Sequence, residues 1–406
     1  MSGKDTSSLR LKKRRRPTEI SKSTRDTESE ETRLFLSWLS KYYVDFSAGA
    51  LPVVEEFLIE DNGDATFLNS QPQAARDSQD KLRVFYDPKT LTVKKLNCML
   101  KNINLNVFRA LQKTIKHCSY LNVLQLDFCD LSREQVEVLE ETLKLQSSMR
   151  YLSLRGNPRC RDNAYLLVNV GLKVLNLRMC QIDQHALKKV SDAFLSSSPD
   201  AGLLHLDLSS NQLFDGSCKY IASILRCDRG LLSLNVSDCK ITDNGLAEIL
   251  ECFRRFELRD EELFLRRKLR LEYYGMLYGS GITYRTDIEQ LIKTHPFTSA
   301  VESEDGKLYC AGNNKLENLN LAYNALTDGG IDLVMKLLFE STAETRLTRI
   351  GLEGNGEGLD AKKSVGDLLR ISRGRQSAAS VRSKGSLRRK VSSGRNLTSS
   401  LGTGAN

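Results

Sequence analysis

A pattern of leucines at fixed spacing, Leu-x-x-Leu-x-Leu-x-x-Asn/Cys-x-Leu, constrains this chain more than any other feature. Residues 121–131 satisfy every position of the pattern. Four further clear copies begin at Leu172, Leu203, Leu231 and Leu316, and weaker copies begin at Val93, Met149 and Leu347. Each copy is typical of the strand and turn that open one repeating structural unit.

The spacing of these copies predicts the fold class. Successive copies start 28, 28, 23, 31, 28, 85 and 31 residues apart. A period near 28 leaves room for a helix after each strand, and the fixed leucines of one unit can be buried only by stacking on the next unit. The sequence therefore predicts an α/β solenoid with a parallel inner sheet and outer helices, its repeats at residues 93–253 and 316–359.

Helix signals follow the strands at the expected offset. Ser132 and Gln135 form a capping-box pattern ahead of an apolar face with helical period. A Thr-Asp pair opens the segment after two other copies, at Thr242 and at Thr327. Because this pair recurs at the same distance from the start of each copy, it supports the register of the repeats.

The cysteines are interpreted as structural. Ten cysteines are present without any Cys-x-x-Cys spacing, and four of them, Cys98, Cys129, Cys180 and Cys239, are assigned to the recurring Asn/Cys position. An Asn there can bond to the backbone of the turn, and a thiol is a small, weaker substitute. We expect reduced thiols rather than disulfides or metal ligands.

The positive charge of the chain lies at its two ends. The formal net charge is +9, residues 1–17 carry +6 and residues 361–406 carry +10, so the middle carries −7. We expect 1–30 and 360–406 to be disordered basic tails. The run 12–17 is typical of a nuclear-import signal, or of a segment that binds microtubules, nucleic acid or acidic lipids. Ser377 and Ser392 follow basic residues and are candidate phosphorylation sites.

The 85-residue interval indicates an insertion of about 55 residues, which we place at 254–315. Residues 257–274 predict a charged helix, with acidic residues such as Glu261 leading and Arg266, Arg267 and Arg270 trailing, as suits a helix dipole. Two interpretations stay open: a solvated helix standing off the solenoid, or a docking element for a partner. Residues 275–314 are predicted to be irregular loop, with a second helix at 286–293 and a hairpin strand at 305–309.

Residues 31–92 precede the repeats and are assigned to an N-terminal capping region. The stretch 33–46 is rich in aromatic residues and holds Trp38, the single tryptophan. Together with 51–59 it is expected to cover the first repeat, because the end of a solenoid exposes its core. The alternative is a partner-binding helix.

Signals of catalysis are absent from the sequence. The four histidines have no metal-ligand spacing, and no nucleophile motif is present. We expect a protein that is not an enzyme, with no cofactor and no small-molecule substrate. The first apolar stretch follows a basic tail, so no signal peptide is expected, and no run is long enough for a membrane span. The expected location is the cytoplasm, with the nucleus as the alternative.

The concave sheet is the remaining candidate site for function. Side chains of the strands other than the leucines should face it, and the early ones mix aromatic residues, Arg and Met, as interfaces do. The candidate residues are Gln125, Asp127, Phe128, Tyr151, Arg155, Asn176, Arg178, Met179, Asp207, Asn235, Asp238, Asn320 and Tyr323. We expect proteins as partners, and no aromatic residues are interleaved with the cations of the tails to indicate sequence-specific nucleic-acid binding.

Residues 93–357 resemble the ribonuclease-inhibitor family of leucine-rich-repeat proteins. The resemblance implies an open horseshoe, protein binding and no enzymatic activity. Segments 253–271, 305–313 and 316–321 also resemble a narrower group of leucine-rich-repeat proteins with a charged insertion at this point, which implies a structural role in motile cilia or sperm flagella. Alternative functions for this repeat type are regulation of a small GTPase and substrate recognition for a ubiquitin ligase.

Overall fold

A computed structural model of the 406-residue chain describes residues 35–59, 65–68, 80–101, 103–195, 202–278, 286–340 and 345–356. Both predicted basic tails, the run 12–17 and the candidate phosphorylation sites Ser377 and Ser392 lie outside the described residues. Among the described helices, none is both long and apolar enough to cross a membrane.

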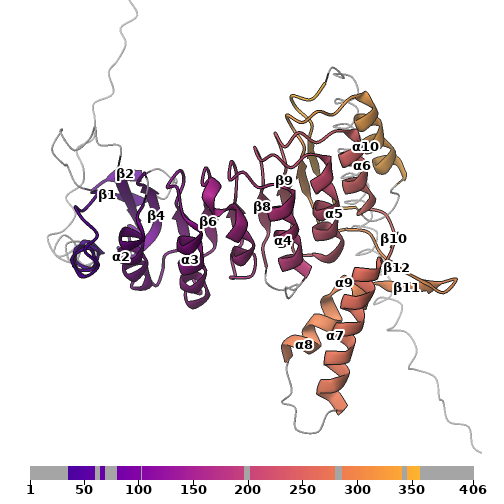
Figure 1. Ribbon diagram of the computed structural model, residues 1–406, viewed down its shortest axis with the longest axis horizontal. Helices are drawn as coiled ribbons and strands as arrows, with labels where there is room; N and C mark the ends of the chain where they lie inside the picture. The colour runs from indigo at the N-terminus through magenta and orange to yellow at the C-terminus, as the bar shows by residue number, and fades with distance from the viewer. Residues whose placement is uncertain are drawn as a thin grey trace, which may run out of the picture.

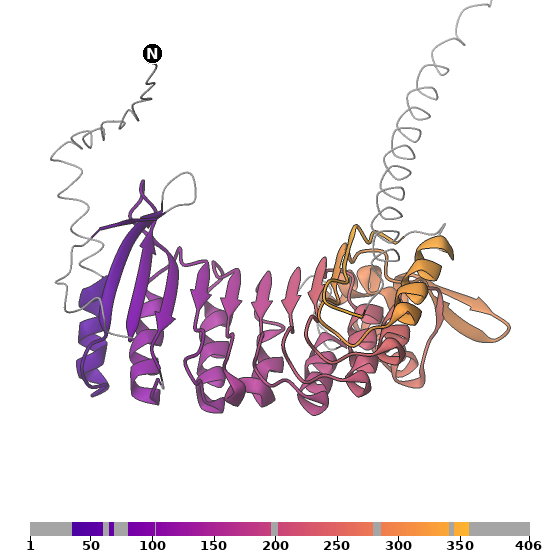
Figure 2. The ribbon, with the colours of Figure 1, turned by 90° about the horizontal axis from the view of Figure 1, so that it is seen from above.

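The eight copies of the leucine pattern form eight neighbouring strands of an eleven-stranded sheet. Consecutive repeat strands are parallel and share one register throughout. They form the regular arc of arrows in Figure 2, which confirms the predicted solenoid. The strands are β4 (Val93–Met99), β5 (Val123–Gln125), β6 (Tyr151–Ser153), β7 (Val174–Asn176), β8 (His205–Asp207), β9 (Ser233–Asn235), β13 (Asn318–Asn320) and β14 (Arg349–Gly351).

Helices line the opposite side of the arc (Figures 1 and 2). The predicted capping box of α3 is present, since the Ser132 and Gln135 side chains each bond to the other residue's backbone N–H. In the 23-residue repeat that begins at Met149 a 3-10 helix replaces the α-helix, because fewer residues must span the same path. The elements are α2 (Leu105–Lys116), α3 (Arg133–Leu145), η2 (Pro158–Leu167), α4 (Gln184–Leu195), η4 (Asp215–Ser217), α5 (Cys218–Cys227), α6 (Asp243–Glu251) and α10 (Asp328–Glu340).

The core is a stack of aliphatic side chains between the sheet and the helices. Leu124 pairs in register with Leu96 on one side and Leu152 on the other, and all three are fully buried. Burying one such side chain contributes about 1.5–3 kcal/mol. Because each leucine is covered by its neighbours in adjacent repeats, the units stabilise one another.

The Asn/Cys position forms a second ladder, of hydrogen bonds. The Asn157 amide oxygen accepts from the backbone N–H groups of Cys129 and Leu131, at 3.1 and 3.0 Å. Its amide nitrogen donates to the carbonyls of Leu126 and Leu154, both at 2.7 Å. Asn211 and Asn324 repeat the arrangement, each donating to carbonyls of its own and the preceding repeat.

The cysteines of this ladder are Cys129, Cys180 and Cys239, and each thiol donates to a carbonyl of the preceding repeat. The assignment of Cys98 to the same position was wrong. Asn97 pairs with Gln125, so Cys98 stands in register with Leu126, inside β4 and within the apolar core. The first copy matches the pattern poorly, so the sequence alone did not show which position of the pattern Cys98 occupies.

The region before the repeats extends the sheet. Strand β3 (Lys81–Tyr86) runs antiparallel to β4, β1 (Val53–Ile59) runs parallel to β3, and β2 (Ala65–Phe67) forms the edge. The N-terminal helix at 35–45 buries Phe35, Leu39 and Tyr43 in the same apolar core as the repeats.

The insertion folds into a unit of its own that projects from the solenoid (Figure 1). The predicted second helix and hairpin are present, but the prediction of mostly irregular loop at 275–314 was wrong. Helix α7 continues through Gly275, and His295–Pro296 begins another helix because proline suits the first helical turn. The elements are β10 (Phe256–Glu257), α7 (Asp260–Tyr278), α8 (Thr286–Thr294), α9 (Pro296–Ser299), β11 (Val301–Glu304) and β12 (Lys307–Cys310).

The repeat sheet continues across the insertion without a gap. Strand β9 pairs directly with β13, which follows it by 85 residues along the chain. Asn324 accepts from the backbone N–H groups of Cys239 and Ile241, and Thr327 bonds to the Asp243 carboxylate. These contacts join the sixth and seventh repeats, so the insertion leaves the arc continuous.

Candidate protein-interaction surfaces

Six of the candidate concave residues lie within strands. They are Gln125, Tyr151, Asn176, Asp207, Asn235 and Asn320. All except Tyr151 occupy one position of the repeat, so the strand pairing aligns them in a single polar row across the sheet. They alternate with the buried leucines, as the sequence predicted.

The other seven candidates lie in the turns that follow the strands, so the prediction that they belong to strands was wrong. They are Asp127, Phe128, Arg155, Arg178, Met179, Asp238 and Tyr323. Phe128, Met179, Asp238 and Tyr323 share one repeat position and have positive φ near 55°. This left-handed backbone turns each side chain out at the rim of the sheet.

Several polar candidates hold these turns together. The side-chain oxygens of Asn176, Asp207, Asn235 and Asn320 each accept from the backbone N–H two residues later, at 2.9–3.1 Å. Asp127 accepts from the Ser153 hydroxyl and the Arg155 N–H. Asn and Asp commonly cap turns in this way, so their carbonyl or carboxylate oxygens are already engaged in the structure.

An apolar and basic cluster remains at the early end of the arc. We name Phe128, Tyr151, Arg155, Arg178 and Met179 the β5–β7 patch. The guanidinium of Arg155 lies 5.3 Å from the centre of the Phe128 ring, and Phe128 is 51% and Met179 40% exposed. The Phe128 ring lies where a side chain at Gly156 would be, so glycine at 156 leaves room for the ring.

The later end of the concave face is polar. A shallow cavity of about 370 Å³ lies over β9, β13 and β14. It is lined by Ser233, Asn235, Asn318, Asn320, Arg349 and Glu353, together with Leu319 and Gly351. An aromatic side chain is exposed at this end as well, since Tyr323 is 66% exposed at the repeat position of Phe128. The β5–β7 patch differs in placing Phe128, Tyr151 and Met179 on three neighbouring repeats.

The insertion is attached to the solenoid through a buried ion pair. Arg226 of α5 donates two hydrogen bonds to the carboxylate of Glu262 in α7, both at 2.6 Å, and both side chains are at most 7% exposed. The Arg226 guanidinium also lies 3.7 Å from the centre of the Phe256 ring and donates to the Glu257 carbonyl. These contacts of Arg226 fix the start of α7 against α5.

The predicted docking residues of the insertion divide into two groups. Arg266 is turned inward, where it donates to the Phe297 carbonyl at 2.7 Å, so it serves the fold of the insertion. Glu261, Arg267 and Arg270 are exposed on α7. The charge pattern predicted the helix but could not show which cation faces the neighbouring short helix.

His295 is buried at the junction of α8 and α9, where its Nδ1 accepts from the Phe297 N–H. Burial, and secondarily the positive charge of Arg229, lowers its pKa from 6.5 to about 4. The unfolded chain therefore takes up this proton near pH 6.5, whereas the folded chain takes it up only near pH 4. Stability should fall as the pH drops through this window.

We expect the free energy of unfolding to decrease by about 3 kcal/mol between pH 7 and pH 4 because of this one histidine. His295→Asn keeps a helix-capping acceptor without the titration. Urea unfolding at several pH values should give a shallower pH dependence for His295→Asn than for the wild type. Equal slopes for the two proteins would contradict the assignment.

The buried cysteines do not resemble nucleophiles. Burial raises the pKa of Cys118, Cys239 and Cys252 to about 12, so these thiols stay protonated at neutral pH. All ten cysteines are free and buried. In the described part of the chain, no cluster of His, Cys, Asp and Glu could hold a metal ion.

Comparison with known proteins places the repeats in a family. The family model described as "Leucine Rich repeat" matches residues 230–250 and 312–335, on both sides of the insertion. Mouse ribonuclease inhibitor is 27% identical over 240 residues, covering 57% of this chain and 52% of the inhibitor. This chain is a leucine-rich-repeat protein of the ribonuclease-inhibitor type.

Other relatives share the repeats with this leucine-rich-repeat protein. Human NACHT, LRR and PYD domains-containing protein 13 is 28% identical over 59% of this chain and 23% of its own length. Zebrafish (Danio rerio) Tonsoku-like protein is 28% identical over 59% of this chain and 18% of its own length. The matches span about half, or less, of the lengths of these relatives. A solved structure of leiomodin-1 actin-binding site 2 covers 55% of this chain and 96% of its own, with 15% identity and a TM-score of 0.34, too low to establish a common fold.

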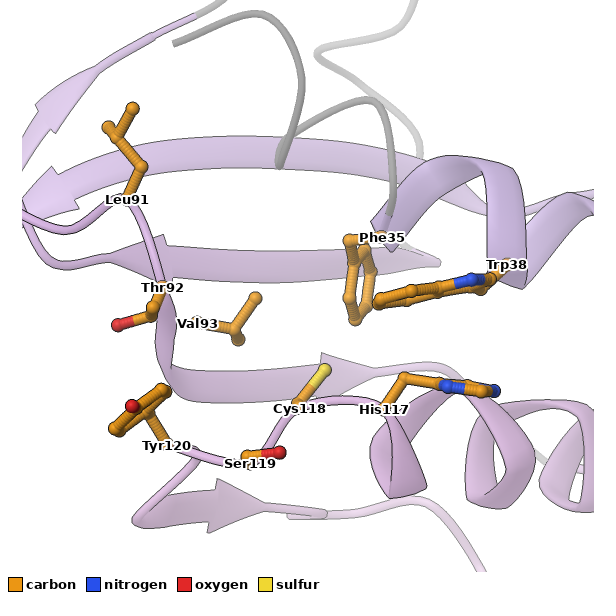
Figure 3. A pocket seen from close by; sticks show the side chains of 9 residues that line it. All are labelled: Phe35, Trp38, Leu91, Thr92, Val93, His117, Cys118, Ser119 and Tyr120. Carbon is orange, nitrogen blue, oxygen red and sulfur yellow. The ribbon is translucent and has the colours of Figure 1, made fainter. Parts of the chain in front are cut away.

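The leucine-rich-repeat protein has a further pocket of about 210 Å³ where the N-terminal helix meets the first repeat (Figure 3). Trp38 stacks on His117 with ring centres 4.4 Å apart, and the Tyr42 hydroxyl lies 2.8 Å from His117 Nε2. The single tryptophan is thus engaged in fastening the N-terminal helix to α2.

Proposed function

We propose that this leucine-rich-repeat protein is a non-catalytic scaffold that binds another protein through the β5–β7 patch. The observation that supports this most directly is the composition of the patch. Two exposed apolar side chains, a tyrosine and two arginines lie on adjacent repeats, and these residue types are enriched at protein interfaces.

The geometry of the arc also supports the proposal. Neighbouring strands lie about 4.8 Å apart, so the three repeats present a continuous rigid surface rather than a deep cleft. Repeat solenoids commonly use such extended surfaces to bind proteins. One relative, ribonuclease inhibitor, is by its name a protein that acts on another protein.

For the location, we propose motile cilia or sperm flagella. The support is the resemblance of segments 253–271, 305–313 and 316–321 to a narrower group of leucine-rich-repeat proteins with a charged insertion. A scaffold at an axoneme requires protein contacts and no catalysis, which agrees with the proposed role of the β5–β7 patch.

Site-specific photo-crosslinking in multiciliated cells tests both parts of the proposal. A photoreactive phenylalanine analogue replaces Tyr151 in the patch or, as control, the exposed Lys188 on the outer helix α4. We expect axonemal proteins to crosslink at position 151 and not at 188. When Arg178→Glu is combined with the photoreactive residue at position 151, the yield of crosslinked partner should fall about tenfold, because the substitution removes an interface arginine.

Two outcomes would argue against these proposals, and they can be told apart. Equal crosslinking from positions 151 and 188, or no effect of Arg178→Glu, would contradict the binding patch. Recovery of the protein only in nuclei would contradict the ciliary location and leave the patch standing.

A further inference from the structure

Helix α7 presents a second surface, far from the β5–β7 patch. Its first turn is held to the solenoid by the Arg226–Glu262 ion pair, and beyond it only Leu269 and Met276 of the helix are buried. The helix projects away from the repeats with α8 along one side (Figure 1). One face of a rigidly attached helix is thus left exposed.

That face carries large apolar and aromatic side chains at helical spacing. We name Phe264, Leu271, Tyr274 and Tyr278 the α7 stripe. Their exposed fractions are 71%, 71%, 44% and 81%. Separations of seven, three and four residues place them along one side of the helix, over a length of about 21 Å. A solvated helix would normally carry polar side chains there.

Positive charge accompanies the α7 stripe. Arg267, Lys268 and Arg270 are exposed between its members. Among the ion pairs of the described residues, none joins these three cations to a carboxylate. After the first turn, α7 contains a single acidic residue, Glu272.

We propose that the α7 stripe is a docking site for an acidic amphipathic helix of a partner protein. The stripe would bury the apolar face of such a helix, and the three cations would pair with carboxylates beside that face. This goes beyond the β5–β7 patch and uses a different surface. Together the two surfaces would let one chain hold two partners.

The charges favour this occupant over two others. A second copy of this chain packed antiparallel on the stripe would bring two sets of three cations into one interface, and like charges there are repulsive. An anionic membrane would also approach Asp260 and Glu261 at the start of α7. An acidic helix brings charge opposite to the three cations, and one no longer than the stripe can end before Asp260 and Glu261, which a membrane surface would not do.

A designed peptide binding to the full chain tests the proposal. The probe is a peptide of about 18 residues with leucine at helical spacing and glutamate beside it, long enough to span the stripe. One control peptide carries lysine in place of glutamate, and another has the same composition with the spacing scrambled. Fluorescence anisotropy should show the glutamate peptide binding at least about tenfold more tightly than either control.

Variants of the protein locate the site. Leu271→Asp should weaken binding of the glutamate peptide about tenfold or more. Leu145→Asp is the matched control, since Leu145 on α3 is 76% exposed and lies outside the insertion. The double variant Arg267→Glu/Lys268→Glu should reverse the preference toward the lysine peptide. Because these side chains are exposed, we expect unchanged circular dichroism spectra.

Each competing result would overturn the proposal. Equal binding of all three peptides, or equal effects of Leu271→Asp and Leu145→Asp, would show that the stripe does not select an acidic helix. Dimerisation in sedimentation experiments that Leu271→Asp abolishes, without selective peptide binding, would assign the stripe to a second copy. Binding to phosphatidylserine vesicles but not to the glutamate peptide would assign it to a membrane.

Discussion

Arg226→Ala is expected to lower the free energy of unfolding by about 3–5 kcal/mol, because it leaves the Glu262 carboxylate buried without its partner. Both carboxylate oxygens receive a hydrogen bond from Arg226, and the Glu262 side chain is 7% exposed. The substitution also removes the guanidinium from the Phe256 ring and the bond to the Glu257 carbonyl. Urea unfolding followed by circular dichroism measures the loss.

Two further variants separate the burial of charge from the loss of packing. Arg226→Met combined with Glu262→Leu should be more stable than either single variant, because no unpaired charge is then buried. Arg255→Ala is the control, since Arg255 forms exposed ion pairs with Glu302 and Glu304 in the same insertion. A loss for Arg226→Ala no larger than that for Arg255→Ala would refute the proposed anchoring.

Asn157→Leu is expected to be about as damaging, with a loss of about 3–5 kcal/mol. The side chain is fully buried, accepts from two backbone N–H groups and donates to three backbone carbonyls. A leucine of similar size leaves these backbone groups without partners, and each buried unsatisfied group costs about 1–3 kcal/mol. Urea unfolding again gives the magnitude.

The cysteines of the same ladder supply a graded comparison. Asn157→Cys should cost less than Asn157→Leu, because a thiol at this position donates to a carbonyl of the preceding repeat, as Cys129 and Cys180 do. Asn169→Leu is a control for an exposed asparagine with a single bond, to the Ala193 carbonyl. If the cysteine and leucine variants were equally unstable, the hydrogen-bond account of the ladder would be wrong.

Much of the fold could be predicted because its determinants are local and repeated. The leucine spacing located eight strands, and the capping box at Ser132 located the start of α3. Both patterns lie within a few consecutive residues, and the leucine pattern recurs in every repeat, so each copy supports the assignment of the others. The offset of Cys98 was missed where the pattern is weakest, in the first copy.

The candidate sites could be predicted less well from the sequence than the fold. The side-chain oxygens of Asn176 and Asp207 accept hydrogen bonds from backbone N–H groups of the turns, which the leucine pattern did not predict. The sequence analysis did not predict the hydrogen bonds between repeats that join Asp215 to Thr242 and Asp243 to Thr327. The recurrence of the Thr-Asp pair at the same repeat position was a signal for them. Arg226 and Glu262 are 36 residues apart in sequence, and no periodicity relates them.

The sequence by itself determined the solenoid, its repeat count and the place where the insertion interrupts it. Burial explains this, since only leucines at that spacing can stack into a continuous core. Only the tertiary structure decided which side chains form surfaces. The β5–β7 patch depends on stacking of three repeats and on left-handed turns at Phe128 and Met179. The α7 stripe depends on a buried ion pair that holds the helix away from the core. Both arise from contacts between residues far apart in the chain, which a local pattern does not encode.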